Sequence, residues 1–370
     1  MKGNYIYMYP PLAFISKLQN KNEYMDYTKL KKVFSNLGVK LTLTEDEFID
    51  FILSDNCLNM SNSKYRDING VIYRTMLTVA EVMDATNMDN ISIVAETRDN
   101  FMFPLILDKW SKCKQVYKPD NDFAHCLIQT KNLSISRSMI EHIPTNLFYI
   151  DTSDCEIFGD IDGIFTYVHK RDTDVIFNIY ILAKNEYFSF YIGGFINELG
   201  MVDINFDKLA NFEHDYNAIV VEDGKLVHKA VIENNRMDRK TASLFAIQMV
   251  AYLSVEQPQI TESDLTKNTY IKKSPYAKVR NKWSEVKIED VGIKYGADFR
   301  KTIKEYNNTT IIKKDSNKRN SPIPHFRSAH WHKYWVGKGR KELRVKWIEP
   351  IFVGNGKSNN VIIHKVKNET

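Results

Sequence analysis

Two alternating segments near the C-terminus place the strongest constraint on the fold. Ala329–Trp335 and Glu342–Val353 flank a Gly-Lys-Gly sequence at residues 337–339. Apolar and polar residues alternate along the second segment, which is the period of a β-strand with two different faces. Two such segments joined by a short connection that contains glycine predict a β-hairpin. We expect Pro350 to interrupt its second strand.

The alternation assigns different side chains to the two faces of this hairpin. Trp331 and Trp335 should project from one face of the first strand, and His330, His332 and Tyr334 from the other. On the second strand, one parity is apolar and the other charged: Leu343, Val345, Trp347, Ile351 and Val353 against Glu342, Arg344 and Lys346. Large aromatic side chains usually pack in cores. The tryptophans are therefore predicted to be core anchors, with a histidine-rich, cationic face opposite them.

Upstream of the hairpin, two sequence periods predict an α+β fold. Residues 1–143 carry apolar residues at helical spacing, and Thr44 and Glu47 form a capping box ahead of one helix. Residues 144–260 become strand-like and predict an antiparallel sheet, followed by an apolar helix over Arg239–Val255 that packs across it. The expected strands are Leu147–Asp151, Gly163–His169, Asp174–Ala183 and Tyr187–Gly193, with a further hairpin from Ala218–Val221 and Lys225–Ile232.

Residues 261–370 form a third region that differs from the rest of the chain in charge. They contain 25 Lys and Arg against 11 Asp and Glu, a net of +14, whereas residues 1–260 have a net of −9. A strongly basic segment indicates an anionic partner, most often nucleic acid, and the alternative is a solvated basic face. Gly292 and Gly296 lie within this region and are expected to mark a strand with a turn. Residues 313–322 are polar and charged, which predicts a loop.

The histidine-bearing face of the hairpin leaves several functions open. An RNA-contacting surface would use cations for phosphates and planar rings for stacking. Its candidate residues are His325, Lys333, Lys338, Arg340, Arg344 and Lys346. A ribonuclease would need a general base, a general acid and a cation that stabilises the phosphorane. The candidates for those catalytic roles are His330, His332, Arg327 and Tyr334.

Two further interpretations of the same face need no RNA. A metal site could use His325, His330 and His332, but no Cys, Asp or Glu stands nearby at a familiar ligand spacing, so no metal is expected. A purely structural hairpin would hold its rings with hydrogen bonds. A second metal candidate is an acidic cluster, although Asp and Gly are also common turn residues. Its members are Asp151, Asp154, Glu156, Asp160 and Asp162.

Other features narrow the class of protein. The four cysteines are scattered and form no CxxC pair, which is typical of reduced cytosolic thiols. No apolar run reaches the roughly 18 residues of a membrane span, and the first residues do not form a secretory signal. Gly356-Lys357-Ser358 resembles the end of a P-loop, but the glycine required five positions earlier is Ile351. We therefore expect no nucleotide cofactor and no membrane partner.

The hairpin and its flanks carry a long motif that resembles a known family. It runs Pro324-His325-x-Arg327-x-x-His330-Trp331-His332-x-Tyr334-Trp335-x-Gly337-x-Gly339 and continues in Arg344-Val345-x-Trp347 and Phe352-Val353. The motif is similar to the type V-A anti-CRISPR proteins that prevent production of the type V-A CRISPR effector nuclease. A weaker resemblance extends upstream through Gly296, Gly292 and Pro258, and it does not cover residues 1–140.

The resemblance implies a mechanism that composition does not show. Members of the family are thought to recognise the N-terminal peptide of the nascent effector and to trigger degradation of its mRNA. The implied partners are a nascent polypeptide, with the type V-A effector as the candidate, and its mRNA or the ribosome. The protein would then belong to a phage or plasmid and act in the bacterial cytoplasm. The alternatives are a toxin-like ribonuclease and a non-catalytic protein-binding inhibitor.

Overall fold

The structure is a computed structural model whose chain forms two compact units, Met1–Lys114 and Gln115–Thr370. It describes residues 11–12, 15, 18–19, 24–84, 90–130, 132–183, 186–204, 219–222, 225–228, 239–263, 286–308, 325–340, 342–353 and 362–363. The expected loop at 313–322 and the P-loop-like residues 356–358 lie outside this part of the chain. The α+β fold class predicted from the sequence is confirmed.

The first unit is helical. Its elements are α2 (Tyr27–Asn36), α3 (Glu45–Leu53), η1 (Asp55–Leu58), α4 (Arg66–Asp84) and α5 (Asn90–Cys113). The predicted capping box is present, because Thr44 accepts from the backbone N–H of Glu47 and Glu47 accepts from that of Thr44. Phe34, Phe48 and Phe101 pack edge to face or tilted, with ring centroids 5.7–6.4 Å apart. These three buried rings join α2, α3 and α5 in one core.

The second unit is built on an eight-stranded mixed sheet in the order β6-β5-β4-β3-β2-β1-β10-β9. Strands β2 (Leu147–Asp151), β3 (Ile161–Lys170), β4 (Asp174–Ala183) and β5 (Glu186–Ile196) form the predicted antiparallel meander. The remaining strands are β1 (Gln115–Pro119), β6 (Val202–Ile204), β9 (Ile260–Glu262) and β10 (Lys287–Val291). β1 and β10, which come from outside residues 144–260, lie parallel to β2 and extend the predicted antiparallel sheet into a mixed one.

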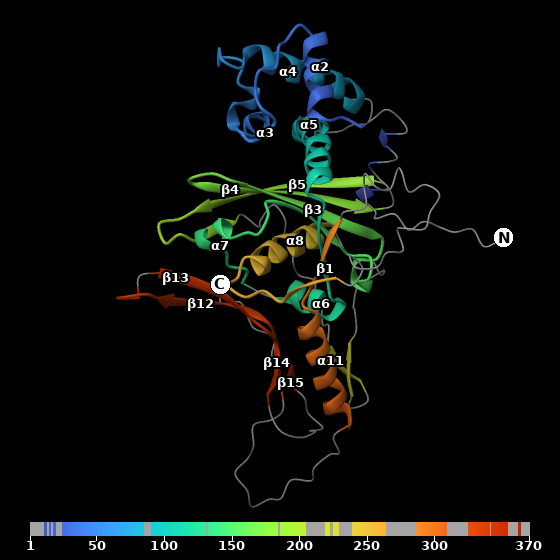
Figure 1. Ribbon diagram of the computed structural model, residues 1–370, viewed down its shortest axis with the longest axis vertical. Coiled ribbons are helices and arrows are strands. Elements are labelled where there is room, and N and C mark those ends of the chain that lie inside the picture. Colours follow the sequence, from blue (N-terminus) through green and yellow to red (C-terminus); the bar gives the residue numbers. More distant parts are fainter. Residues whose placement is uncertain are drawn as a thin grey trace, which may run out of the picture. The chain divides into compact units, whose positions relative to one another are not determined.

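Helices α6 (Asn121–Gln129) and α8 (Arg239–Leu253) supply most of the core against the sheet. α8 packs on β3 and β4, as predicted (Figure 1). Its residues from Thr241 to Leu253 are buried, with the exception of Leu244. α6 follows β1 and leads through the short α7 (Arg137–Glu141) into the parallel strand β2, which is the usual crossover between parallel neighbours. A separate hairpin, β7 (Ile219–Glu222) with β8 (Lys225–His228), agrees with the sequence pattern.

Helix α11 (Ile293–Asn308) was not predicted, because Gly292 and Gly296 look like turn residues. Gly292 has φ +74° and ends β10, and a Cβ there would lie 2.3 Å from Cγ of Phe123. Gly296 lies inside the helix, where a Cβ would meet Oδ1 of Asp120 at 1.9 Å. Both glycines therefore allow α11 to approach α6 closely. Gly292 forms the expected bend after the strand, whereas Gly296 lies within the helix and marks no turn.

The C-terminal residues form two small sheets. β12 (His330–Val336) pairs with β13 (Glu342–Ile348) in the predicted hairpin. The second sheet contains β11 (His325–Arg327), β14 (Ile351–Val353) and β15 (Ile362–Ile363). The break between β13 and β14 falls at Pro350, as predicted. Figure 1 shows β12 and β13 running outward from the region of α6, with the base of the hairpin near the helices.

Candidate nucleic-acid interface

A cluster of four aromatic rings holds the base of the hairpin. Trp347 of β13 packs edge to face on Phe123, Tyr252 and Tyr295, with ring centroids 5.4–5.6 Å apart. These three partners come from α6, α8 and α11. Because each contact is of the edge-to-face type and the rings are buried, the cluster fixes the hairpin against three helices at once.

Hydrogen bonds reinforce this base. Nε1 of Trp347 donates to Oγ1 of Thr130 at 3.1 Å, and Nε2 of Gln248 donates to the carbonyl of Thr130 at 3.2 Å. The hydroxyl of Tyr295 donates to Sγ of Cys126 at 3.0 Å. Burial raises the pKa of Tyr295 far above its ordinary value and that of Cys126 to about 12, so both groups stay neutral at neutral pH.

The register of β12 and β13 confirms the predicted division of residues between two faces. Trp331 lies opposite Trp347, His332 opposite Lys346, and Tyr334 opposite Arg344. Directly opposed residues share a face of a sheet. One face therefore carries the two paired tryptophans, and the other carries histidine, tyrosine, arginine and lysine.

The histidine-bearing face presents two parallel rings. The centroids of His332 and Tyr334 are 6.2 Å apart and their planes differ by 7°. His332 is exposed and Tyr334 is half-buried. Lys346 and Arg344 stand opposite them on β13. We call His332, Tyr334, Arg344 and Lys346 the ring–cation face.

Trp335 corrects one sequence prediction. It shares a face with Trp331, which is 6% exposed, but Trp335 is 47% exposed and does not anchor the core. The reason is its position near the turn, beyond the helices that bury Trp331 and Trp347. Lys333, a candidate phosphate contact, is exposed and lies opposite Val345, hence on the tryptophan face. The two sides of the hairpin thus both carry a cation and an exposed or partly exposed ring.

The turn brings two more candidate cations to the end of the hairpin. Gly337 and Gly339 adopt φ of +81° and +78°, and N–H of Arg340 donates to the carbonyl of Gly337 at 3.0 Å. Lys338 and Arg340 are exposed there. On the ring–cation face, Arg344 forms an ion pair with Glu256, so part of its charge is already matched within the protein.

The remaining candidates lie in different settings. Arg327 is exposed on β11, in the other small sheet, and His325 is on the same strand with its side chain outside the described residues. His330 is half-buried, and its Nδ1 lies 3.3 Å from the carbonyl of Ser328. No hydrogen bond among the described residues joins any two of the four proposed catalytic side chains.

Within the described residues, no group of three or more His, Cys, Asp or Glu is arranged to hold a metal ion. The acidic cluster considered from the sequence has other partners instead. Asp151 is buried and accepts from N–H and Oγ of Ser153 at 3.0 and 2.6 Å, and Asp154 pairs with Lys118 at 2.5 Å. These carboxylates thus stabilise the end of β2 and its connection to β3.

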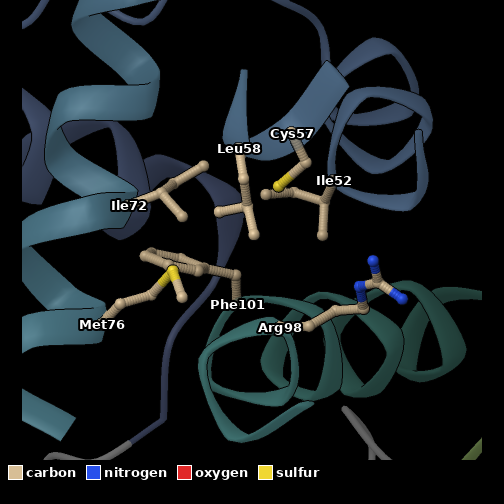
Figure 2. A pocket seen from close by; sticks show the side chains of 7 residues that line it. All are labelled: Ile52, Cys57, Leu58, Ile72, Met76, Arg98 and Phe101. Carbon is tan, nitrogen blue, oxygen red and sulfur yellow. The ribbon is translucent and has the colours of Figure 1, made fainter. Parts of the chain in front are cut away.

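A small pocket lies in the first unit. It offers roughly the space of one water molecule, about 10 Å³. Figure 2 shows side chains of α4 facing Phe101 of α5, and the lining consists of Ile52, Cys57, Leu58, Ile72, Met76, Arg98 and Phe101. It is too small and too apolar to compete with the hairpin as a site for a charged ligand. Among the described residues, no helix is long and apolar enough to span a membrane.

Comparison with known protein families gives a match to most of the second unit. The family model for AcrVA2-like proteins, described as the anti-CRISPR type V subtype A2 family, matches residues 117–355. The chain belongs to this family. The match begins within β1 and takes in the sheet, α6, α8, α11 and the hairpin, whereas the helical first unit lies outside it. Membership supports an anti-defence function for this AcrVA2-like chain. No curated protein matches it.

Proposed function

We propose that this AcrVA2-like chain recognises a nascent polypeptide and lowers the amount of the mRNA that encodes it. The candidate target is the type V-A CRISPR effector nuclease, and the expected compartment is the bacterial cytoplasm. Family membership supports an anti-defence role. The proposal assigns contact with the mRNA, or with ribosomal RNA, to the hairpin.

The observation that carries the RNA contact is the parallel arrangement of His332 and Tyr334 beside Lys346. The two rings are nearly parallel, with centroids 6.2 Å apart, and each offers a flat face on which a base can stack. A cation on the neighbouring strand is placed to neutralise the adjacent phosphate. Each stacked base is worth about 1–3 kcal/mol, and stacking works for every base because each has a π-face.

The double substitution His332→Ala and Tyr334→Ala tests this assignment. The rings lie on the exposed part of the hairpin, away from Trp347, so the fold should survive their removal. We expect binding of the purified chain to RNA to weaken about tenfold or more, and loss of the target mRNA in cells to slow with it. Phe195→Ala is the matched control, because Phe195 is a 73% exposed ring on β5. Unchanged mRNA loss in the double variant would remove the hairpin from the mechanism.

The same purified protein separates RNA contact from intrinsic cleavage. His330 and His332 project from one face two positions apart on a strand, a spacing of about 6–7 Å. If the chain cut RNA unaided, and His330→Ala and His332→Ala each abolished cutting, the ribonuclease function would replace the proposed one. If RNA is bound and remains intact, mRNA loss must come from a host nuclease.

A further inference from the structure

We infer that the hairpin inserts into the opened groove of a structured RNA, with both of its faces in contact with the nucleic acid. This inference rests on the proposed RNA contact and adds the class of RNA and the mode of binding. It follows from three observations on the outer part of the hairpin: the distribution of charge, the distribution of exposed rings and the place at which burial ends.

The charge of the outer hairpin is high and surrounds it. Residues 332–346 contain six Lys and Arg and one Glu, a net of +5. Lys346 stands on the ring–cation face, Lys333 on the opposite face, and Lys338 and Arg340 at the turn. A ribbon that lay flat on one strand of RNA would leave one of these faces unused. Cations on both faces suit a position between two rows of phosphates.

The exposed rings show the same two-sided arrangement. Trp335 is 47% exposed on the side opposite the stacked pair of His332 and Tyr334. Tryptophan has a large apolar ring, and its removal from water is favourable. Its exposure at the end of an otherwise charged hairpin therefore indicates a contact surface. Rings stack on unpaired bases, which a regular duplex does not offer.

Burial ends part-way along the hairpin and so defines the part that can insert. Trp331, Val345 and Trp347 are 6%, 7% and 9% exposed and belong to the core of the second unit. From Lys333 to the turn, the residues of β12 are exposed or half-buried on both faces, while Leu343 on β13 still packs against the core. The aromatic cluster at the base holds the ribbon in place, so insertion requires no ordering of a free loop.

The geometry selects among nucleic acids. A two-stranded ribbon fits a major groove as wide as that of B-DNA, whereas the major groove of regular A-form RNA is too narrow for side chains. A bulge or internal loop opens that groove and supplies unpaired bases at the same place. An RNA stem with a bulge therefore satisfies the cations on both faces and the three rings, while single strands, regular RNA duplexes and DNA duplexes each satisfy only some of them.

Binding of the full chain to four fluorescent probes tests the inference. The probes are an RNA stem-loop with a three-nucleotide bulge, the same stem without the bulge, a single strand of the same composition, and the corresponding DNA duplex. We expect the bulged stem to bind about tenfold more tightly than each of the others, because it alone offers both an open groove and unpaired bases. Equal or tighter binding of the single strand or the DNA duplex would overturn the inference.

Lys333→Ala and Lys346→Ala form a matched pair on opposite faces. The slope of log affinity against log salt is negative. If each lysine neutralises one phosphate, each substitution should reduce the magnitude of this slope by about one, and the double variant should reduce it by about two. Trp335→Ala should weaken binding of the bulged stem about tenfold. If Lys346→Ala changes the slope while Lys333→Ala and Trp335→Ala do not, RNA contact survives on one face and insertion is wrong. If no probe binds, the proposed RNA contact itself fails.

Discussion

The indole N–H of Trp347 donates a hydrogen bond to Oγ1 of Thr130, 3.1 Å away, and both residues are buried. The bond joins the end of β13, at the buried base of the hairpin, to the residue that follows α6. The two residues are separated by more than half of the chain. The counterpart of Trp347, Trp331, lies directly opposite on β12, but its buried Nε1 has no hydrogen-bond partner among the described residues. Two neighbouring tryptophans thus hold the hairpin by different means.

This difference makes a prediction about paired Trp→Phe substitutions. Trp347→Phe should lower the free energy of unfolding by about 1 kcal/mol more than Trp331→Phe, because only the first loses a hydrogen bond. Denaturant unfolding of both variants measures the difference. A double-mutant cycle of Trp347→Phe with Thr130→Val should return a coupling of similar size. Equal losses in the two Trp→Phe variants would contradict the assignment.

Gly292 and Gly337 allow a second matched comparison. Both have positive φ, +74° and +81°, but a Cβ at Gly292 would overlap Phe123, whereas nothing lies within 4 Å of a Cβ at Gly337. Gly337→Ala should therefore cost only the left-handed strain, about 1–2 kcal/mol. Gly292→Ala adds an overlap in a packed core and should cost several kcal/mol in total. Thermal unfolding would show the two variants losing the same stability if the approach of α11 to α6 were not constrained.

The buried thiol of Cys57 should make the stability of the first unit depend on pH. Burial raises the pKa of this thiol from 9.0 to about 11. Between these values the unfolded chain loses the proton and the folded chain keeps it, so stability falls as pH rises through this window. The stability of the wild type relative to Cys57→Ala should drop by about 2 kcal/mol between pH 9 and 11. A constant difference across that range would exclude this thiol as the cause.

Replacement of Asn178 on β4 by an apolar residue should stabilise the chain. Its side chain is fully buried, and neither Oδ1 nor Nδ2 has a hydrogen-bond partner among the described residues. An unsatisfied buried amide costs about 1–3 kcal/mol, so Asn178→Leu should raise the melting temperature by roughly 2–4 °C. Asn178→Asp is the control and should lower it, since it buries a charge. A fall in both variants would show that the amide is satisfied in solution.

The sequence predicted the local elements of the fold better than their assembly. Thr44 and Glu47 fixed one helix start. The β-branched and aromatic residues of Asp174–Ala183, with turn residues on either side, gave the bounds of β4 to the residue. The parallel pairing of β1 with β10 joins residues more than 170 positions apart, and no local period encodes it. Helix α11 was missed because a glycine usually indicates a turn. Gly296 lies in a helix because the nearby carboxylate of Asp120 leaves no room for a Cβ, and this contact is visible only in three dimensions.

The candidate site shows the same division. Strand parity placed His332 and Tyr334 together and Trp331 behind them, which the register confirms. Parity could not show where burial ends along the hairpin, so Trp335 was predicted in the core and is exposed. The closeness of Trp335 to the turn could have predicted this exposure from the sequence. The partner of Arg344, Glu256, lies 88 positions away and was not foreseen.

Recoding the start of the target gene tests whether a nascent polypeptide directs loss of its own mRNA. One version carries synonymous codons, which change the RNA and keep the peptide. The other carries compensating frameshifts, which keep nearly the same RNA and change the peptide. We expect this chain to lower the synonymous mRNA as much as the original and to leave the frameshifted mRNA at its normal level. Loss of both mRNAs, or of the frameshifted one alone, would contradict this expectation.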